Sequence, residues 1–219
     1  MTETTLEPSR PRVTTTAPTL TVIPLDHPTV ARAVRRLGDS EQMHRTVMAL
    51  FADGLAADRE AARAAAGILY RLDNPANRSP RLLVQHRCPL KAGLAGPPLQ
   101  QADLGPVLTA LRPGMAVHFR AVLNAVRSQT ATGKRLAVTD EVDLVGWGLD
   151  RFTGAGLGGV QLADRPKTEL GHAKRALWTA QYDGIGTVTD AERLREAVQN
   201  GLGRAKAYGC GLLSLAAAR

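Results

Sequence analysis

The sequence predicts an α+β protein built from two tandem ferredoxin-like domains, each with the element order β-α-β-β-α-β. In the first half, a strand pattern is followed by an amphipathic helix and two further strand patterns. The second half again reads as strand, helix, two strands, helix and strand. A segment rich in Gly and Pro, residues 91–113, separates the halves and indicates a connection between domains.

The first domain is expected over residues 19–95, after an extension over 1–18 whose Thr and Pro content predicts disorder. Apolar and β-branched runs bounded by turn residues predict its strands, at residues 19–25, 67–72 and 81–87. A linker is expected over 96–112, with a short helix near 105–111 that belongs to the linker or to the first domain.

The helix of the first domain has a clear start signal. Asp39 is a favourable N-cap residue and Gln42 follows three residues later, which resembles a capping box. The helix is predicted over residues 40–52, with a buried face formed by Met43, Val47, Leu50 and Phe51. His44 then lies at the margin of this face, where its ring can pack and still reach a cleft, and Arg45 projects further toward solvent.

The second domain is expected over residues 113–219. Its strands are predicted at residues 115–126, 173–181, 185–189 and 212–216. Its helices are predicted at residues 142–152 and 191–200, the second of them with Asp190 as N-cap.

The composition is that of an ordinary globular protein, with 44% hydrophobic residues in a chain of 219. The apolar stretches are too short for a bilayer and the N-terminus lacks the features of a signal peptide, so we expect a cytoplasmic protein without a membrane partner. Cys88 and Cys210 lie far apart and the histidines are scattered. We therefore expect no metal site, no cofactor and no disulfide framework.

The net charge of +8 arises in the middle of the chain, because residues 67–135 hold ten basic and two acidic side chains while the flanking segments are balanced. These basic residues are Arg71, Arg78, Arg81, Arg87, Lys91, Arg112, Arg120, Arg127, Lys134 and Arg135. The excess indicates a surface for a polyanion; the alternative is a set of solvated arginines without a ligand. The eight aromatic residues favour recognition of nucleic-acid backbone and shape over base stacking.

The segment from Gly201 to Leu215 combines glycines, cations and a strand pattern. Its glycines allow the backbone N–H groups to point outward and hold phosphates, and two cations stand among them; these residues are Gly201, Gly203, Gly209 and Gly211, with Arg204 and Lys206. A helix C-cap and close packing are the alternative interpretation. The order helix, glycines, strand is the reverse of a dinucleotide-binding or P-loop motif, so such an enzyme is not expected.

Four short motifs accompany this loop: Met43-His44-Arg45, Gly67-Ile68-Leu69-Tyr70-Arg71-Leu72, Val117-His118-Phe119-Arg120 and Thr132-Gly133-Lys134-Arg135. With them, residues 19–217 resemble CasE, the repeat-processing endoribonuclease of type I-E CRISPR systems and a subunit of the Cascade surveillance complex. The resemblance implies tandem ferredoxin-like domains, a CRISPR repeat RNA hairpin and other Cascade subunits as partners, and a monomer when the protein is free.

The same resemblance implies metal-independent cleavage at the 3′ base of the hairpin. The upstream 2′-hydroxyl attacks the scissile phosphate and leaves a 2′,3′-cyclic phosphate and a 5′-hydroxyl. His44 matches the catalytic histidine of the family, and an imidazole can take or give the protons that this reaction moves. Arg45 and Glu41 are the other candidate catalytic residues.

Glu41 departs from the family pattern, which has a tyrosine three residues before the histidine. An ionised Glu41 would favour the protonated imidazolium of His44 and bias it toward a general acid. Alternatively, Glu41 only pairs with Arg45 on the helix surface. The second proton-transfer group therefore stays open.

The candidate RNA-binding residues come from the second domain: Arg120, Arg127, Lys134, Arg135, Gly201, Gly203, Arg204, Lys206, Tyr208, Gly209 and Gly211. Two other functions compete with cleavage. One is an inactive subunit that holds the hairpin in the same complex, which the missing tyrosine favours. The other is an assembly subunit that grips protein chains and meets RNA incidentally.

Overall fold

The computed structural model describes residues 17–34, 39–51, 63–74, 79–129, 134–172 and 176–218. Most of the expected N-terminal extension, residues 1–16, lies outside the described residues. Within them the chain forms helices and antiparallel sheets, as the sequence predicts for an α+β protein.

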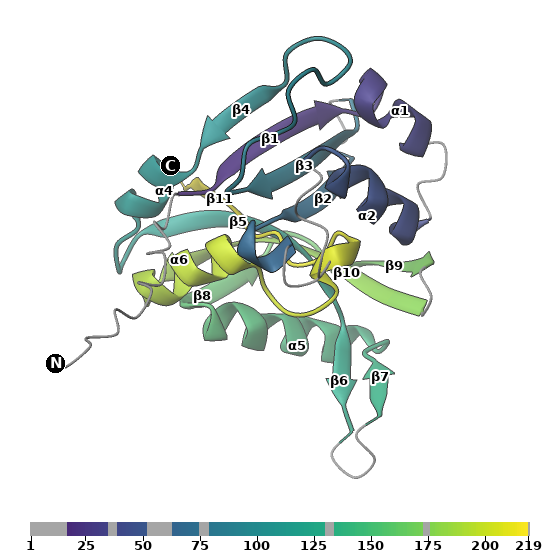
Figure 1. Cartoon of the computed structure of the whole chain (residues 1–219). Helices are drawn as coiled ribbons and strands as arrows, with labels where there is room; N and C mark the ends of the chain where they lie inside the picture. Colours follow the sequence, from purple (N-terminus) through teal and green to yellow (C-terminus); the bar gives the residue numbers. More distant parts are fainter. Residues whose placement is uncertain are drawn as a thin grey trace, which may run out of the picture.

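The first sheet has four antiparallel strands in the order β2-β3-β1-β4. They are β1 (Thr19–Pro24), β2 (Leu69–Asp73), β3 (Arg81–His86) and β4 (Gln100–Asp103). Helices α1 (Pro28–Val34) and α2 (Ser40–Met48) connect β1 to β2 and lie beside this sheet in Figure 1. Their apolar side chains and those of one sheet face form a common core that includes Val30, Val47 and Ile23.

The second sheet has the strand order β11-β5-β10-β8, and β9 also pairs with β10. Its strands are β5 (Ala116–Asn124), β8 (Leu157–Leu162), β9 (Lys167–His172), β10 (Ala176–Val188) and β11 (Ser214–Ala217). Helices α5 (Glu141–Gly154) and α6 (Ala191–Asn200) belong to this unit. The rings of Phe119 and Phe152 lie 4.3 Å apart between centroids and join β5 to α5 in the core.

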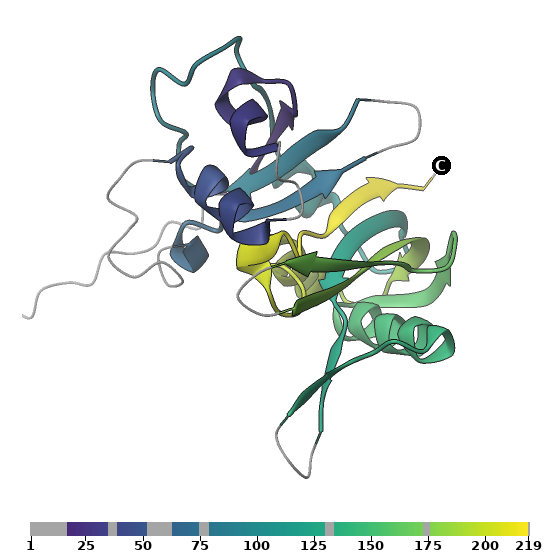
Figure 2. The same ribbon diagram turned by 90° about the vertical axis from the view of Figure 1, so that its right-hand side faces the viewer.

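Four smaller elements lie between these strands and helices in the sequence. Helix α4 (Gly105–Ala110) lies between the two sheets in the sequence. Strands β6 (Val126–Ser128) and β7 (Arg135–Ala137) form a hairpin that extends from the second unit away from the first in both views (Figures 1 and 2). The 3-10 turn η2 (Lys206–Tyr208) lies between α6 and β11.

Strands β2 and β3 are buried on both faces of the first sheet, since consecutive residues, which point to opposite sides of a strand, are almost all buried there. Leu82 and Val84 face the helices, whereas Leu83 packs with Leu69 and with Leu212 of the second unit. This second, smaller apolar cluster joins the two units. It also explains the nearly continuous apolar run in β3.

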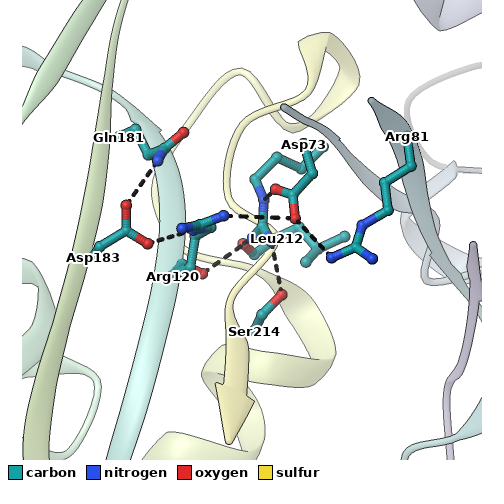
Figure 3. A network of polar contacts seen from close by, with 8 residues as sticks. Asp73, Arg81, Arg120, Gln181, Asp183, Leu212 and Ser214 are labelled. Carbon is teal, nitrogen blue, oxygen red and sulfur yellow. Dashed lines mark hydrogen bonds and ion pairs between the residues drawn. The ribbon is translucent and has the colours of Figure 1, made fainter. Parts of the chain in front are cut away.

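A buried network of charges crosses the same junction (Figure 3). Arg71 is 2% exposed, and its Nε donates to Asp73 Oδ1 at 2.8 Å. Its Nη1 donates to the carbonyl oxygens of Leu212 (3.0 Å) and Arg120 (3.1 Å), and its Nη2 donates to Ser214 Oγ at 3.0 Å. Burial lowers the pKa of Arg71, and the hydrogen bond to Asp73 acts in the opposite direction.

Two further arginines extend this network. Arg120 donates from Nε to Asp183 Oδ1, and its Nη1 lies 3.8 Å from Asp73 Oδ2. Arg81 Nη2 is also 3.8 Å from that carboxylate oxygen, and Gln181 donates to Asp183 Oδ2 at 2.7 Å. The network therefore links β2 and β3 of the first sheet to β5 and β10 of the second.

The C-terminal end of α6 is a third contact between the units. Gln85 Nε2 on β3 donates to the carbonyl oxygen of Val198 at 2.9 Å. Arg87 Nη2 donates to the carbonyl oxygen of Gln199 at 3.2 Å and to Asn200 Oδ1 at 3.0 Å. Cations and N–H donors are favourable at this end of a helix because its last carbonyl groups lack intrahelical partners and carry partial negative charge.

The first unit differs from the sequence prediction in its second half. The expected linker, residues 96–112, contains strand β4, which pairs with β1. No helix occurs between β3 and β4 in the fully described stretch 87–99, where prolines and glycines disfavour one. The short helix expected near 105–111 is present as α4, but it follows β4. Helix α1 was not expected.

The second unit contains one long strand where two were expected. The predicted break between the two strands, residues 182–184, includes Gly184, but in β10 this glycine is a site of close packing: a Cβ there would lie 2.7 Å from Phe119 Cζ. Strand β8 was missed because its Gly158 and Gly159 lower the strand signal. The remaining predicted elements, including the strands 115–126 and 212–216 and both helices, are present with shifted ends.

We predict that Asp73→Asn lowers the free energy of unfolding by about 3–5 kcal/mol, because it leaves the charge of Arg71 buried without its carboxylate partner. Urea denaturation of the variant and the wild type measures this difference. Asp143→Asn, which removes a half-exposed pair with Arg127, is the control and should cost about 1 kcal/mol or less. Equal losses in the two variants would contradict the importance of the buried network.

Candidate functional site

Helix α2 places His44 as the sequence predicts. Asp39 caps the helix: its Oδ1 accepts from the backbone N–H of Gln42 at 2.9 Å and of Glu41 at 3.1 Å. Met43 and Val47 are buried, and His44 lies beside them at the half-buried margin.

The helix ends at Met48, earlier than the predicted end at residue 52, which lies outside the described residues. Leu50 and Phe51 are nevertheless buried, and Phe51 forms an isolated backbone bridge with Leu90. The four predicted core residues of this segment are therefore confirmed, although two of them lie beyond the helix.

Arg45 and Glu41 lie on the outer part of the same helix. Arg45 is exposed and its Nε donates to the backbone carbonyl oxygen of Glu41 at 3.4 Å. Glu41 is half-buried in the first turn, one helical turn before His44. The two are thus brought near the histidine, and the effect of Glu41 on the protonation of His44 stays a prediction.

The glycine-rich loop leaves α6 through Gly201, whose φ of 75° ends the helix. A Cβ at this position would lie 2.9 Å from the side chain of Leu69, so the glycine also permits contact with the first sheet. Gly211, with φ 90°, is similar: a Cβ there would lie 2.6 Å from the carbonyl oxygen of Leu202. The alternative interpretation of this segment, a helix C-cap and close packing, therefore accounts for Gly201 and Gly211.

Gly203 and Gly209 differ from that pair. Both have positive φ, of 69° and 82°, but Gly203 has open space around it. Gly209 lies against the ring of Tyr70: a Cβ on Gly209 would lie 3.2 Å from Tyr70 Cε2. Arg204, between the two, is exposed.

The turn η2 carries the loop toward α2. Tyr70 of β2 donates from its hydroxyl to the carbonyl oxygen of Ala207 at 2.9 Å. Burial raises the pKa of Tyr70, so the phenol keeps the proton that it donates. On the other side, Lys206 Nζ donates to the carbonyl oxygen of Asn200 at 2.7 Å.

The loop thus brings Tyr208 to His44, with 6.3 Å between ring centroids and 62° between ring planes. Tyr208 belongs to the second unit and His44 to the first. Figure 2 shows the turn beside α2. The candidate site is therefore formed by both units together.

Positive charge gathers at this loop. Burial and the nearby charge of Arg63 lower the pKa of Lys206. Arg63 is itself buried, and its Nη1 donates to the carbonyl oxygen of Ile68 at 2.6 Å. Neither Arg63 nor Tyr70 was predicted as a site residue from the sequence. Tyr70 lies in one of the four short motifs, which could have indicated it, whereas no local pattern marks Arg63.

The other predicted RNA-binding residues lie elsewhere. Arg127, Lys134 and Arg135 are exposed on the β6–β7 hairpin, and Arg127 Nη1 donates to Asp143 Oδ2 at 3.0 Å. Thr132 and Gly133 lie outside the described residues. Arg120 was expected at an RNA surface, but its guanidinium contacts Asp183 and Asp73 at the junction and is 35% exposed.

The described residues contain no group of three or more His, Cys, Asp or Glu side chains with metal-site geometry. None of the helices in the part of the chain that the structure describes is long and apolar enough to cross a membrane. Cys88 and Cys210 are both free thiols.

Comparison with known proteins gives consistent results. The family described as "CRISPR associated protein" matches residues 20–217. The CRISPR-associated endoribonuclease Cse3 of Thermus thermophilus is 30% identical over 213 residues, which cover 85% of this chain and 94% of that protein. The CRISPR system Cascade subunit CasE of Escherichia coli is 32% identical over 121 residues, 48% of this chain and 60% of that protein.

A solved structure is similar as well. It is the Thermus thermophilus Cse3 bound to an RNA representing a pre-cleavage complex, with a TM-score of 0.72 and 27% identity. The similarity covers 91% of this chain and 99% of the other.

We predict that Gly211→Ala destabilises the protein by about 2 kcal/mol or more, because the new methyl group meets the Leu202 carbonyl at a positive φ. Gly203→Ala is the matched control, since it has the positive φ without the contact, and should cost about 1 kcal/mol. Urea denaturation compares the two variants. If they are equally destabilised, close packing does not explain the glycine at position 211.

Proposed function

The chain belongs to the Cse3/CasE family of CRISPR endoribonucleases, and on that premise we propose that it cleaves the repeat hairpin of precursor CRISPR RNA and retains the product as a subunit of a Cascade complex. The observation that carries the proposal is the position of His44. It lies half-buried on α2, against a cationic glycine-rich loop from the second unit.

The proposed reaction needs no metal ion. The 2′-hydroxyl before the scissile phosphate attacks phosphorus in line, and the 5′-oxygen leaves, so that a 2′,3′-cyclic phosphate and a 5′-hydroxyl form. One group must accept the proton of the 2′-hydroxyl and another must protonate the leaving oxygen. His44 performs one of these transfers, because an imidazole exchanges protons near neutral pH.

Positive charge beside His44 would stabilise the phosphorane as its negative charge develops. Arg204 is exposed on the loop, Lys206 on the same loop is half-buried, and Arg63 is buried. Burial and the neighbouring cation lower the pKa of Lys206, and an anion bound beside it would favour the charged ammonium and so oppose both effects. We therefore assign this loop to the scissile end of the RNA stem.

The β6–β7 hairpin is assigned to the stem itself. Its exposed cations, Arg127, Lys134 and Arg135, stand on a two-stranded ribbon that extends from the body of the protein (Figure 1). Contacts of this kind go mainly to phosphates. Arg120 is omitted from the RNA-binding set because its guanidinium is engaged at the junction.

We further interpret the two units as ferredoxin-like domains. In each four-stranded order, the first and third of the four strands in sequence form the centre: β1 and β3 in β2-β3-β1-β4, and β5 and β10 in β11-β5-β10-β8, with β9 and the β6–β7 hairpin outside these four. This arrangement supports the tandem-domain interpretation. The first domain then has a loop in place of its second helix.

An inactive hairpin-binding subunit is the second candidate, favoured by Glu41 at the position where the family has tyrosine. The two candidates differ in whether the RNA is cut, and they agree on RNA binding. The following experiment distinguishes them.

We predict that the wild-type protein cuts a labelled repeat hairpin in excess EDTA, and that His44→Ala reduces the rate by about 100-fold or more because proton transfer is lost. A hairpin with a 2′-deoxy nucleotide before the cut should resist the wild type. Electrophoresis of end-labelled RNA measures cleavage, and filter binding checks that the variant still binds. Binding by the wild type without any cleavage would support the inactive subunit instead.

We predict that replacing Arg127, Lys134 and Arg135 by Ala together weakens hairpin binding and reduces the slope of log K against log salt by about 2–3, since each phosphate contact contributes about 0.7–0.9. Titrations between low and moderate salt give the slope. Arg165→Ala with Arg193→Ala, two exposed arginines outside the proposed site, serve as the control. An equal effect of the control would show that net charge, and not the hairpin, determines binding.

A further inference from the structure

The turn η2 is too short to be stable without contacts from outside it. It has three residues, Lys206–Tyr208, and the hydrogen bonds of a 3-10 turn have poor geometry. Ala205, just before the turn, is left-handed at φ 59°, the one non-glycine positive φ among the described residues. This conformation crowds the Cβ of any residue except glycine, so contacts elsewhere must stabilise it.

Tyr70 on β2 supplies such contacts from the first unit. It is buried, and its hydroxyl donates to the carbonyl oxygen of Ala207, in the middle of the turn, at 2.9 Å. Its ring lies against Gly209 at the end of the turn, where the absence of a side chain permits the close approach. The hydrogen bond has a preferred direction and the ring contact limits how near the chain can come. Together they determine where the turn lies on the first unit.

The position of Tyr70 is fixed by the first unit alone. Its backbone pairs with Val84 of β3, and its ring belongs to the core that also contains Val47 and Ile68. Just before the strand, Arg63 Nη1 donates to the carbonyl oxygen of Ile68 at 2.6 Å. The phenol therefore projects from a rigid sheet, and groups on sheets and helices are placed more accurately than groups on loops.

The position of η2 determines what lies beside His44. The turn contacts α2, the helix that carries His44, and the ring centroid of Tyr208 is 6.3 Å from that of the imidazole. The same loop carries Arg204, which is exposed, and Lys206, which is half-buried. In the proposed reaction these cations stabilise the phosphorane, and their effect depends on their distance from the developing charge.

We propose that Tyr70 is a positioning residue for cleavage: its hydroxyl, from the first unit, fixes the turn η2 and thereby the cationic loop of the second unit beside His44. The inference rests on the proposed function, because it assigns Tyr70 a task in the same reaction. It goes beyond that function by giving a role to a buried side chain that RNA cannot contact directly. The hydrogen bond joins residues 137 positions apart and makes the loop depend on the first unit.

The test compares two buried tyrosines that make the same kind of bond. Tyr182 is buried like Tyr70, and its hydroxyl donates to the carbonyl oxygen of Leu144, also at 2.9 Å, in the core of the second unit. Burial raises the pKa of both phenols, so both remain donors. Tyr70→Phe and Tyr182→Phe each keep the ring and remove one buried hydrogen bond, but only Tyr70→Phe acts on the loop.

Single-turnover cleavage at saturating protein is the first readout. The rate of Tyr70→Phe should fall by about fivefold or more, because the turn loses a hydrogen bond and a small misplacement near the reacting atoms is costly in rate. The Kd of the repeat hairpin should rise by less than about threefold, since the affinity comes mainly from phosphate contacts with exposed cations. Tyr182→Phe, at a separate site, should change neither quantity by more than about twofold.

Hydrogen exchange is the second readout and does not depend on cleavage. The backbone N–H of Tyr208 donates to the carbonyl oxygen of Ala205 at 2.8 Å inside the loop. Its exchange should accelerate by about fivefold or more in Tyr70→Phe, because local opening of the turn becomes easier, and should keep the wild-type rate in Tyr182→Phe. Urea denaturation checks that both variants fold and lose similar stability.

Several outcomes would overturn the inference. If Tyr70→Phe cuts at the wild-type rate, or leaves the exchange of Tyr208 unchanged, the hydroxyl does not position the loop. If Tyr182→Phe is as slow as Tyr70→Phe, the loss follows overall stability and not the turn. If Kd rises as much as the rate falls, the loop serves binding and not the chemical step. Absence of cleavage in the wild type would count against the proposed function, while the exchange readout would still decide whether Tyr70 fixes the turn.

Discussion

The buried guanidinium of Arg71 sets the orientation of the two units, and the candidate site depends on that orientation. Apolar contacts such as those among Leu69, Leu83 and Leu212 are non-directional and allow surfaces to slide. Arg71 adds direction, because its donors meet Asp73 on its own strand and the carbonyl oxygen of Leu212 across the junction. A buried charge is stable only when such partners are in place, so other orientations are disfavoured.

The contacts at this junction also fix the path of the glycine-rich loop. It begins where Arg87 and Lys206 bind the end of α6, and it ends near Leu212 and Ser214, where Arg71 binds. A loop held at both ends against the first sheet has few ways to run between them. The turn η2 therefore reaches α2 as a consequence of domain docking, and Tyr208 meets His44 there.

The elements that the sequence predicted well are those specified by local chemistry. Asp39 predicts the start of α2 because an N-cap residue acts on N–H groups within three residues. The spacing of the apolar residues after it places His44 at the margin of the buried face of the helix. Gly184 made the strand prediction wrong at this point, because the sequence does not show that a glycine is needed there for close packing against Phe119 on a neighbouring strand. The contact between His44 and Tyr208 joins residues 164 positions apart, and no local pattern encodes it.

Charge illustrates the same limit. The basic middle segment suggested one polyanion surface, but the structure divides it: Arg71 and Arg120 hold the junction, whereas Arg127 and Arg135 are exposed on the hairpin. Counting charges along the sequence cannot separate these two groups of arginines, because the carboxylates that pair with some of them are brought close only by the fold. The arginines that contact carboxylates at the junction hold the two units together, whereas the cations that remain exposed are the ones that we propose for an RNA backbone.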